Sequence, residues 1–219
     1  MRGSLTIDVY IDLICPWCLI GNSHLRRALR RLAETDPDID VHVHWHSVQL
    51  MPDVPEEGLP FAQFYERRLG GKQAAQARQA QVRAAATRAD VSVDFSRIAT
   101  FPNTAKAHRL LALGVQKLDA EGLDRLLDRL FSGYFQRGED LGDSATLTAI
   151  AAEHDLDPDT TRAALTASGN PGSSARVEGV PYFVFNRRYA ISGAHPAEVL
   201  HSAMRQAVGH GAPTAARSN

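Results

Sequence analysis

The sequence predicts an α/β protein in which a long helical segment interrupts a mixed sheet. Residues 5–13 and 39–50 show the alternation of apolar and polar residues that is typical of strands, and they enclose a helical pattern. Two further short strand patterns, 180–186 and 188–192, are followed by a last helical pattern. The expected element order is therefore β-α-β, a helical block over about 61–167, and then β-β-α.

The first strand and the first helix meet at a proline. The run "LTIDVYIDL" (5–13) is rich in Ile, Val and Tyr, which favour strands. Pro16 then occupies the first turn of a helix, where its missing N–H would have had no partner anyway. Apolar residues recur at helical spacing over 19–32, and "DPD" (36–38) ends that helix. Because "IDVHVHWHSVQL" (39–50) alternates strictly, the helix can form a parallel crossover between two strands.

The middle of the chain contains no clear strand pattern and favours helices. Residues 61–90 are rich in Ala, Gln and Arg, and Gly70 and Gly71 divide them into two helix-forming halves. Further helices are expected to begin at Asn103, residue 121, Asp143 and Asp157, the last one ending near Gly169.

The order of elements indicates that the two ends of the chain form one core domain. The run "SGNPGSSA" (168–175) is typical of a loop, and residues 186–188 join the last two strand patterns as a hairpin. We expect 1–52 and 176–210 to form a discontinuous core domain and 53–175 to form an inserted helical domain. Residues 211–219 are small and polar and are expected to be a frayed tail.

Composition and charge exclude several classes of function. Hydrophobic residues make up 44% and charged residues 22%, as in ordinary globular proteins, and the net charge of -1 gives no reason to expect nucleic acid. No run reaches the roughly 18 apolar residues of a membrane span. Asp8 and Asp12 stand where the apolar part of a signal peptide would run. We therefore expect a cytoplasmic protein, where a permanent disulfide is unusual.

The two cysteines of the chain form the motif "CPWC" at the junction of the first strand and helix. Cys15 lies at the helix N-terminus, where free N–H groups and the helix dipole favour a thiolate. Cys18 is three residues further on, on the same helical face and within reach of a disulfide. Pro16 stiffens the turn, and Trp17 offers apolar surface to a substrate. We expect Cys15 to be the attacking nucleophile and Cys18 the resolving thiol.

A metal site is the main alternative for the polar side chains of the second strand. His42, His44 and His46 alternate along it, so all three imidazoles lie on one face. They could bind a metal or form the polar face of an edge strand, and we favour the second reading. Two cysteines supply only half of a zinc site, so no metal is expected.

Four segments, "ICPWC", "FPNTAKAHRL", "GVPYFVFN" and "YAISGAHPAEVL", resemble the thioredoxin superfamily, its DsbA-like branch and, more narrowly, the FrnE-like group. The resemblance implies a thioredoxin-like fold with a large all-helical insertion. It also implies a cis bond between Val180 and Pro181 that faces the cysteines, with the Val180 backbone pairing with substrate. Asn103 and His108 would line the substrate cleft, and a nearby His108 would stabilise the Cys15 thiolate.

For these last two residues a structural role is an equal alternative: a helix cap for Asn103 and a packed or solvated side chain for His108. The stretch from Ser168 to Val177 is shorter here than is usual in FrnE-like chains.

The resemblance implies a protein disulfide oxidoreductase or isomerase, acting on protein or small-molecule thiols and disulfides as a monomer or homodimer. No cofactor is expected, except glutathione as a co-substrate. Related 2-hydroxychromene-2-carboxylate isomerases and kappa-type glutathione transferases typically carry serine where Cys15 stands. A glutathione-dependent isomerase or transferase acting on a small aromatic substrate is therefore the alternative enzyme. A chaperone-like binding module that needs neither cysteine is the third hypothesis.

Overall fold

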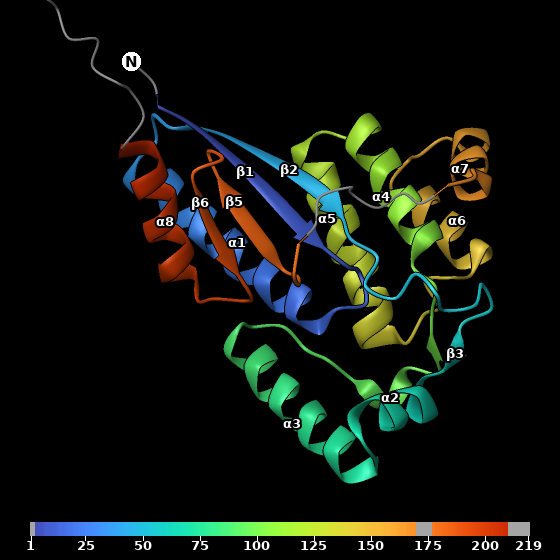
Figure 1. Cartoon of the computed structure of the whole chain (residues 1–219). Helices are drawn as coiled ribbons and strands as arrows, with labels where there is room; N and C mark the ends of the chain where they lie inside the picture. Colours follow the sequence, from blue (N-terminus) through green and yellow to red (C-terminus); the bar gives the residue numbers. More distant parts are fainter. Residues whose placement is uncertain (1–2, 170–176, 210–219) are drawn as a thin grey trace, which may run out of the picture.

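The computed structural model describes residues 3–169 and 177–209, and it contains a four-stranded mixed sheet with the order β2-β1-β5-β6 (Figure 1). The strands are β1 (Ser4–Ile11), β2 (Asp40–Ser47), β5 (Tyr182–Phe185) and β6 (Tyr189–Ser192). β1 is parallel to β2 and antiparallel to β5, which in turn is antiparallel to β6. The β-α-β and β-β-α halves expected from the sequence thus join in one sheet.

One face of this sheet forms the apolar core with two helices, α1 (Pro16–Thr35) and α8 (Ala197–Gly209). Every second residue of β1 is completely buried or nearly so, and Phe183 and Phe185 of β5 continue the same layer. The helices α1 and α8 pack on one another on the same side of the sheet (Figure 1). This layer holds the carboxyl end of β1 and the amino end of α1 in place, and that junction carries the two cysteines.

The predicted hairpin is confirmed, and its turn explains the residue choice. Asn186 and Arg187 both have positive φ values, 49° and 57°, as the two central residues of a type I′ turn require, and the Arg188 N–H closes the turn on the Phe185 carbonyl at 2.9 Å. The Asn186 side chain also accepts a hydrogen bond from the Thr6 N–H at 2.8 Å. The turn is therefore fixed to β1 as well as to its own two strands.

The helical segment between β2 and β5 divides into two groups (Figure 1). One group contains α2 (Phe61–Leu69) and α3 (Lys72–Arg88), separated at the two glycines as expected. The other contains α4 (Ala105–Lys117), α5 (Ala120–Ser132), α6 (Ser144–Ala152) and α7 (Pro158–Thr166). The expected N-terminal caps are present: Asp143 accepts from the Thr146 N–H and Asp157 from the Thr160 N–H.

The structure adds local detail that residue patterns did not predict. A short ladder pairs β3 (Leu59–Pro60) with β4 (Thr100–Phe101), whose two-residue strands are too short to show a period. The helix expected from residue 121 ends in one wide turn of π-helix at Gly133–Arg137, after which Gly138 adopts the left-handed conformation. A 3₁₀ turn (Phe95–Arg97) precedes β4.

The expected domain limits remain a prediction. The boundary at 175 and 176, most of the loop 168–177 and the tail 211–219 lie outside the described residues. Within the described ranges no helix is both long and apolar enough to cross a membrane.

Candidate active site

The two cysteines occupy different environments at the start of α1. Cys15 is the residue that caps the helix, and its carbonyl oxygen accepts from the backbone N–H groups of Cys18 at 2.9 Å and Leu19 at 3.3 Å. Both thiols are free. Cys15 keeps 7% of its surface exposed, whereas Cys18 is completely buried. Only Cys15 can therefore meet a substrate directly.

Val180 and Pro181 complete the surroundings of Cys15. The bond between them is cis, as the resemblance implied. The Cys15 thiol donates to the Val180 carbonyl oxygen, with 3.7 Å between sulfur and oxygen. On the other side of the loop, Pro181 packs directly against Gly21 of α1, where an added Cβ would lie 2.7 Å from the proline Cγ. The glycine thus lets the loop approach the cysteine helix closely.

Burial raises the pKa of the Cys18 thiol well above its usual value, and the hydrogen-bonded Cys15 side chain raises it further. The Asp12 carboxylate adds to the increase, although a hydrogen bond from the Asp12 backbone opposes it. Cys18 is therefore held as a neutral thiol in the resting reduced protein. A step that uses its thiolate needs a nearby group to take the proton.

A buried carboxylate lies beneath the cysteine motif. Asp12 is completely buried; its Oδ2 accepts from the Leu50 N–H at 2.8 Å, and its Oδ1 lies 3.2 Å from Nε2 of His108. His108, from α4, is also completely buried, and its Nδ1 has no hydrogen-bond partner among the described residues. Asp12 thus connects the cysteine loop, the segment after β2 and the helical insertion.

His108 and Asn103 both make contacts within the protein. The buried imidazole of His108 pairs with the Asp12 carboxylate. The Asn103 side chain caps α4, accepting from the Ala105 N–H at 3.0 Å, and it donates to the Val54 carbonyl at 2.6 Å. Asn103 also borders a separate cavity of about 490 Å³. Its capping contact is the structural alternative considered from the sequence.

Trp17 borders a groove beside the cysteine motif. The groove has a volume of about 400 Å³ and runs between α1, α3 and the start of α8, with Trp17, Ile20, His24, Arg27, Gln81, Ala85, Arg88, Ala194, Pro196, Ala197 and Glu198 as its lining residues. The Arg78 guanidinium lies 5.3 Å from the centre of the Trp17 ring. Burial raises the pKa of Tyr65, the charge of Arg78 lowers it, and the charge of Cys15 raises it. Tyr65 is therefore close enough to Cys15 to interact with it electrostatically.

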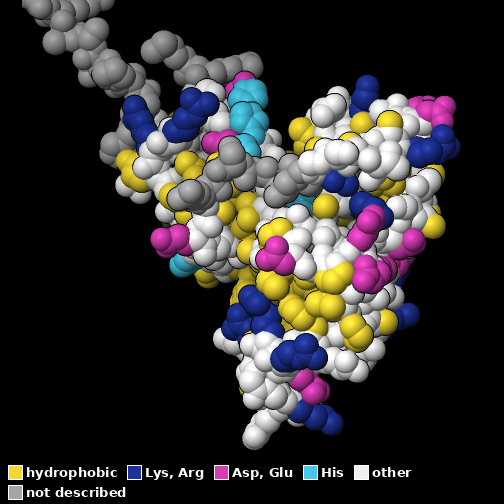
Figure 2. All heavy atoms as spheres, turned by 45° about the vertical axis from the view of Figure 1, so that its right-hand side comes forward, with side chains coloured by type: hydrophobic (Ala, Val, Ile, Leu, Met, Phe, Trp, Pro, Cys, Tyr) yellow, Lys and Arg dark blue, Asp and Glu magenta, His cyan; other side chains and the backbone are white. Residues whose placement is uncertain are grey.

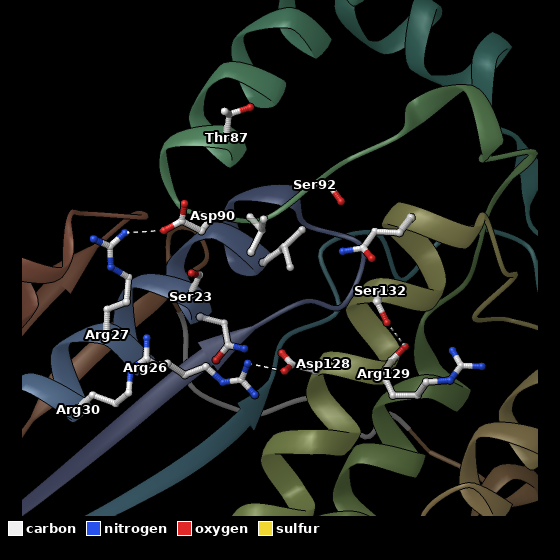
Figure 3. Close-up of a pocket in the computed structure, with 14 residues that line it drawn as sticks. Ser23, Arg26, Arg27, Arg30, Thr87, Asp90, Ser92, Asp128, Arg129 and Ser132 are labelled. Atoms are coloured by element: carbon white, nitrogen blue, oxygen red, sulfur yellow. Dashed lines mark hydrogen bonds and ion pairs between the residues drawn. The ribbon is translucent and has the colours of Figure 1, made fainter.

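A larger cavity of about 790 Å³ lies on another flank of α1, facing α5 and the segment after α3 (Figure 3). Ion pairs cross it. Arg26 of α1 bonds to Asp124 at 2.6 Å and to Asp128, both on α5, and Arg27 lies 3.3 Å from Asp90. These contacts show a polar seam that fastens the helical insertion to the core helix.

The histidine row of β2 has acidic partners instead of a metal-like cluster. Asp8 of β1 accepts from His46 at 2.9 Å and lies 3.5 Å from His44, while His42 pairs with Asp40 at 3.1 Å. In the part of the chain that the structure describes, no group of three or more His, Cys, Asp or Glu side chains is arranged to hold a metal ion.

Asp12, Tyr65, Arg78 and Gly21 were missed as site residues from the sequence. Asp12 could have been identified from the sequence, because an acidic residue in an apolar strand, three positions before a cysteine, is unusual and indicates a functional role. The other three are recognisable only from packing between elements. In the structure Cys15 contacts Val180, and Pro181 packs against the helix that carries both cysteines.

Comparison with known proteins identifies the family to which the chain is similar. The DSBA-like thioredoxin domain family matches residues 6–205. A probable DsbA oxidoreductase from Streptomyces coelicolor superposes with a TM-score of 0.81 at 27% sequence identity, covering 95% of this chain and 92% of that one. Uncharacterized protein YwbO of Bacillus subtilis is 24% identical over 159 residues, which are 73% of this chain and 70% of its own length.

Two more distant structures share the fold. The cytosolic disulfide reductase DsbM from Pseudomonas aeruginosa has a TM-score of 0.57 at 17% identity, covering 92% of this chain and 99% of that one. A 2-hydroxychromene-2-carboxylate isomerase has a TM-score of 0.56 at 14% identity, covering 92% of this chain and 95% of that one. The predicted thioredoxin-like fold class is confirmed. Because the family matches residues 6–205, which are most of the chain, the chain belongs to the DSBA-like thioredoxin domain family of thiol–disulfide oxidoreductases.

Proposed function

We propose that this protein exchanges disulfides through its CPWC motif, with Cys15 as nucleophile and Cys18 as resolving thiol. The observation that carries the proposal is the asymmetry of the pair. Cys15 has residual exposure and faces the Val180 carbonyl, while Cys18 is buried behind it with a raised pKa. A buried, protonated Cys18 does not compete with Cys15 for the substrate, but it can attack the mixed disulfide and release the substrate from Cys15.

In the reductive direction, the Cys15 thiolate attacks one sulfur of the substrate disulfide. A mixed disulfide forms between Cys15 and that sulfur, and the other substrate sulfur leaves as a thiolate. Cys18 then loses its proton and attacks the Cys15 sulfur, so the first substrate sulfur leaves and a Cys15–Cys18 disulfide forms. Two electrons pass from the protein to the substrate. The same steps in reverse oxidise a dithiol.

The buried pair of Asp12 and His108 supports the second step. We propose that, as the Cys18 thiolate forms, its proton moves to the buried Asp12 carboxylate, whose Oδ1 lies 3.2 Å from Nε2 of His108. Both side chains are completely buried, so bulk water does not compete for the proton.

The proposed substrates are protein or small-molecule disulfides that enter along the groove of Trp17. The backbone of Val180, which lies beside Cys15, is suited to pair with an extended segment of substrate. Glutathione is the small thiol that we propose as co-substrate, and the cytosolic disulfide reductase DsbM from Pseudomonas aeruginosa has also been solved with GSH. The cytoplasm is the compartment that we propose.

The test compares insulin reduction and exchange with a fluorescent disulfide peptide in three proteins: wild type, Cys15→Ser and Cys18→Ser. We expect Cys15→Ser to abolish both activities and Cys18→Ser to accumulate a mixed disulfide that mass spectrometry detects on Cys15. Exchange that survives in Cys15→Ser would refute the proposal. Glutathione-dependent isomerisation by that variant would favour the isomerase alternative, and aggregation suppression without exchange would favour the binding module.

A further inference from the structure

The groove beside the cysteine motif has one strongly basic wall. Arg78 stands over Trp17, and its guanidinium donates to Gln81 Oε1 at 2.8 Å. Arg88, the last residue of α3, lines the same groove. Cations of α3 therefore border the groove beside Trp17.

The basic character extends over the whole segment that forms this wall. Residues 67–88 contain no Asp or Glu, and their cationic side chains are Arg67, Arg68, Lys72, Arg78, Arg83 and Arg88. In Figure 2, several dark-blue side chains lie on the lower part of the molecule, where α2 and α3 lie, next to apolar surface. The chain as a whole has a net charge of only -1, so this charge is a local feature.

Carboxylates near the groove stand mainly on the other elements. Glu198 lines the groove from α8, and the exposed Glu178 precedes the loop of Pro181. Asp90, at the end of α3, is 84% exposed and lies 3.3 Å from Arg27. Glu66 of α2 precedes the basic segment. Among the charged residues that line the groove, Arg88 of α3 and Arg27 of α1 are basic and Glu198 of α8 is acidic. The positive charge therefore lies on the side of the groove that α1 and α3 form.

We propose that the α3 wall selects disulfides in polypeptide segments that carry acidic residues beside the disulfide. The inference rests on the exchange function proposed above and specifies its substrate class. Charges placed at the rim of a binding site act mainly on the association step and on its salt dependence. An acidic flank facing Arg78 and Arg88 therefore accelerates encounter with Cys15, and a basic flank slows it.

The experiment uses three peptides with the same intramolecular disulfide, flanked on both sides by Glu, Gln or Lys. At about 20 mM salt, where charges are weakly screened, we expect kcat/KM to be about fivefold higher for the Glu than for the Gln peptide, and lower again for Lys. The Glu-to-Gln ratio should fall to about twofold or less in Arg78→Gln/Arg88→Gln, and also in wild type at about 0.5 M salt. Arg162→Gln serves as the control, because Arg162 lies on α7 and pairs with Asp159 there; it should keep the wild-type ratio.

The outcomes separate the two proposals. Equal rates for the three peptides, all abolished by Cys15→Ser, would overturn the charge selection and leave the exchange function intact. A ratio that persists unchanged in the double variant would also overturn the selection by α3. Failure to exchange any peptide would refute the exchange function itself.

Discussion

Gly21→Ala is the substitution for which the structure gives the sharpest expectation. Gly21 lies inside α1, and a Cβ there would stand 2.7 Å from Pro181 Cγ and 3.3 Å from Phe183 Cζ. Ordinary carbon contacts lie near 3.5–4.0 Å, so something must move by about 1 Å. The proline ring is fused to the backbone and Phe183 is completely buried, so neither neighbour can rotate away.

Overpacking of this kind costs about 1–3 kcal/mol, and alanine in a helix interior returns up to about 1 kcal/mol relative to glycine. We therefore expect a net loss of about 1–2 kcal/mol in the free energy of unfolding, measured by urea denaturation under reducing conditions. Because the loop of Pro181 is the part that must shift, the Val180 carbonyl moves away from Cys15. Exchange with a disulfide peptide should then slow by roughly tenfold, as expected for misplaced reacting groups.

Gly114→Ala provides a matched control. Gly114 also lies inside a helix, and the atom nearest to its added Cβ is Cδ2 of Leu126 on α5, which is completely buried. This variant should also lose stability but keep the wild-type exchange rate, because its crowding lies between α4 and α5 and not beside Cys15. If Gly21→Ala matched wild type in both stability and exchange, the close approach of Pro181 to α1 would not position the site.

Three further expectations concern Cys18, the carboxylate beneath it and the seam of ion pairs. Asp12→Asn removes the proton acceptor, so release of substrate from the mixed disulfide should slow by roughly tenfold in rapid-quench alkylation; an unchanged rate would discard the role of Asp12. Because burial raises the pKa of Cys18 in the folded reduced protein, the unfolded chain ionises this thiol first as pH rises. The stability that it contributes is therefore present below about pH 8.5 and is lost above it, and reduced Cys18→Ala should flatten the decline measured by urea unfolding from pH 7.5 to 9.5; parallel curves would contradict this. Arg26 is partly exposed, so a double-mutant cycle with Arg26→Ala and Asp128→Ala should give a coupling free energy of about 0.5–1 kcal/mol. A coupling free energy near zero would show that this ion pair does not stabilise the protein.

Local patterns predicted the elements because local physics determines them. Pro16 at the helix start, the aspartate caps of α6 and α7, and a hairpin turned at residues 186–188 all depend on a few neighbouring residues. The same applies to the cysteine spacing, since residues three apart on a helix necessarily share a face.

Contacts between distant segments could not be predicted from local patterns. The buried His108 contacts Asp12, which is 96 residues away in sequence. Nothing in the alternation of residues specifies that pair, nor the position of Arg78 over Trp17. Both depend on how the inserted helices pack on the core, and this packing is set by many apolar contacts together.

The long separation in sequence between Cys15 and Val180 has a consequence for folding during translation. Val180 follows Cys15 by 165 residues, so translation at ~5–20 residues per second leaves roughly 10–30 s between their appearances. During that interval the ribosome carries a chain whose two sulfurs have neither the late β-hairpin nor α8 around them. The nascent protein is therefore most open to wrong cross-links before its own chemistry has been assembled.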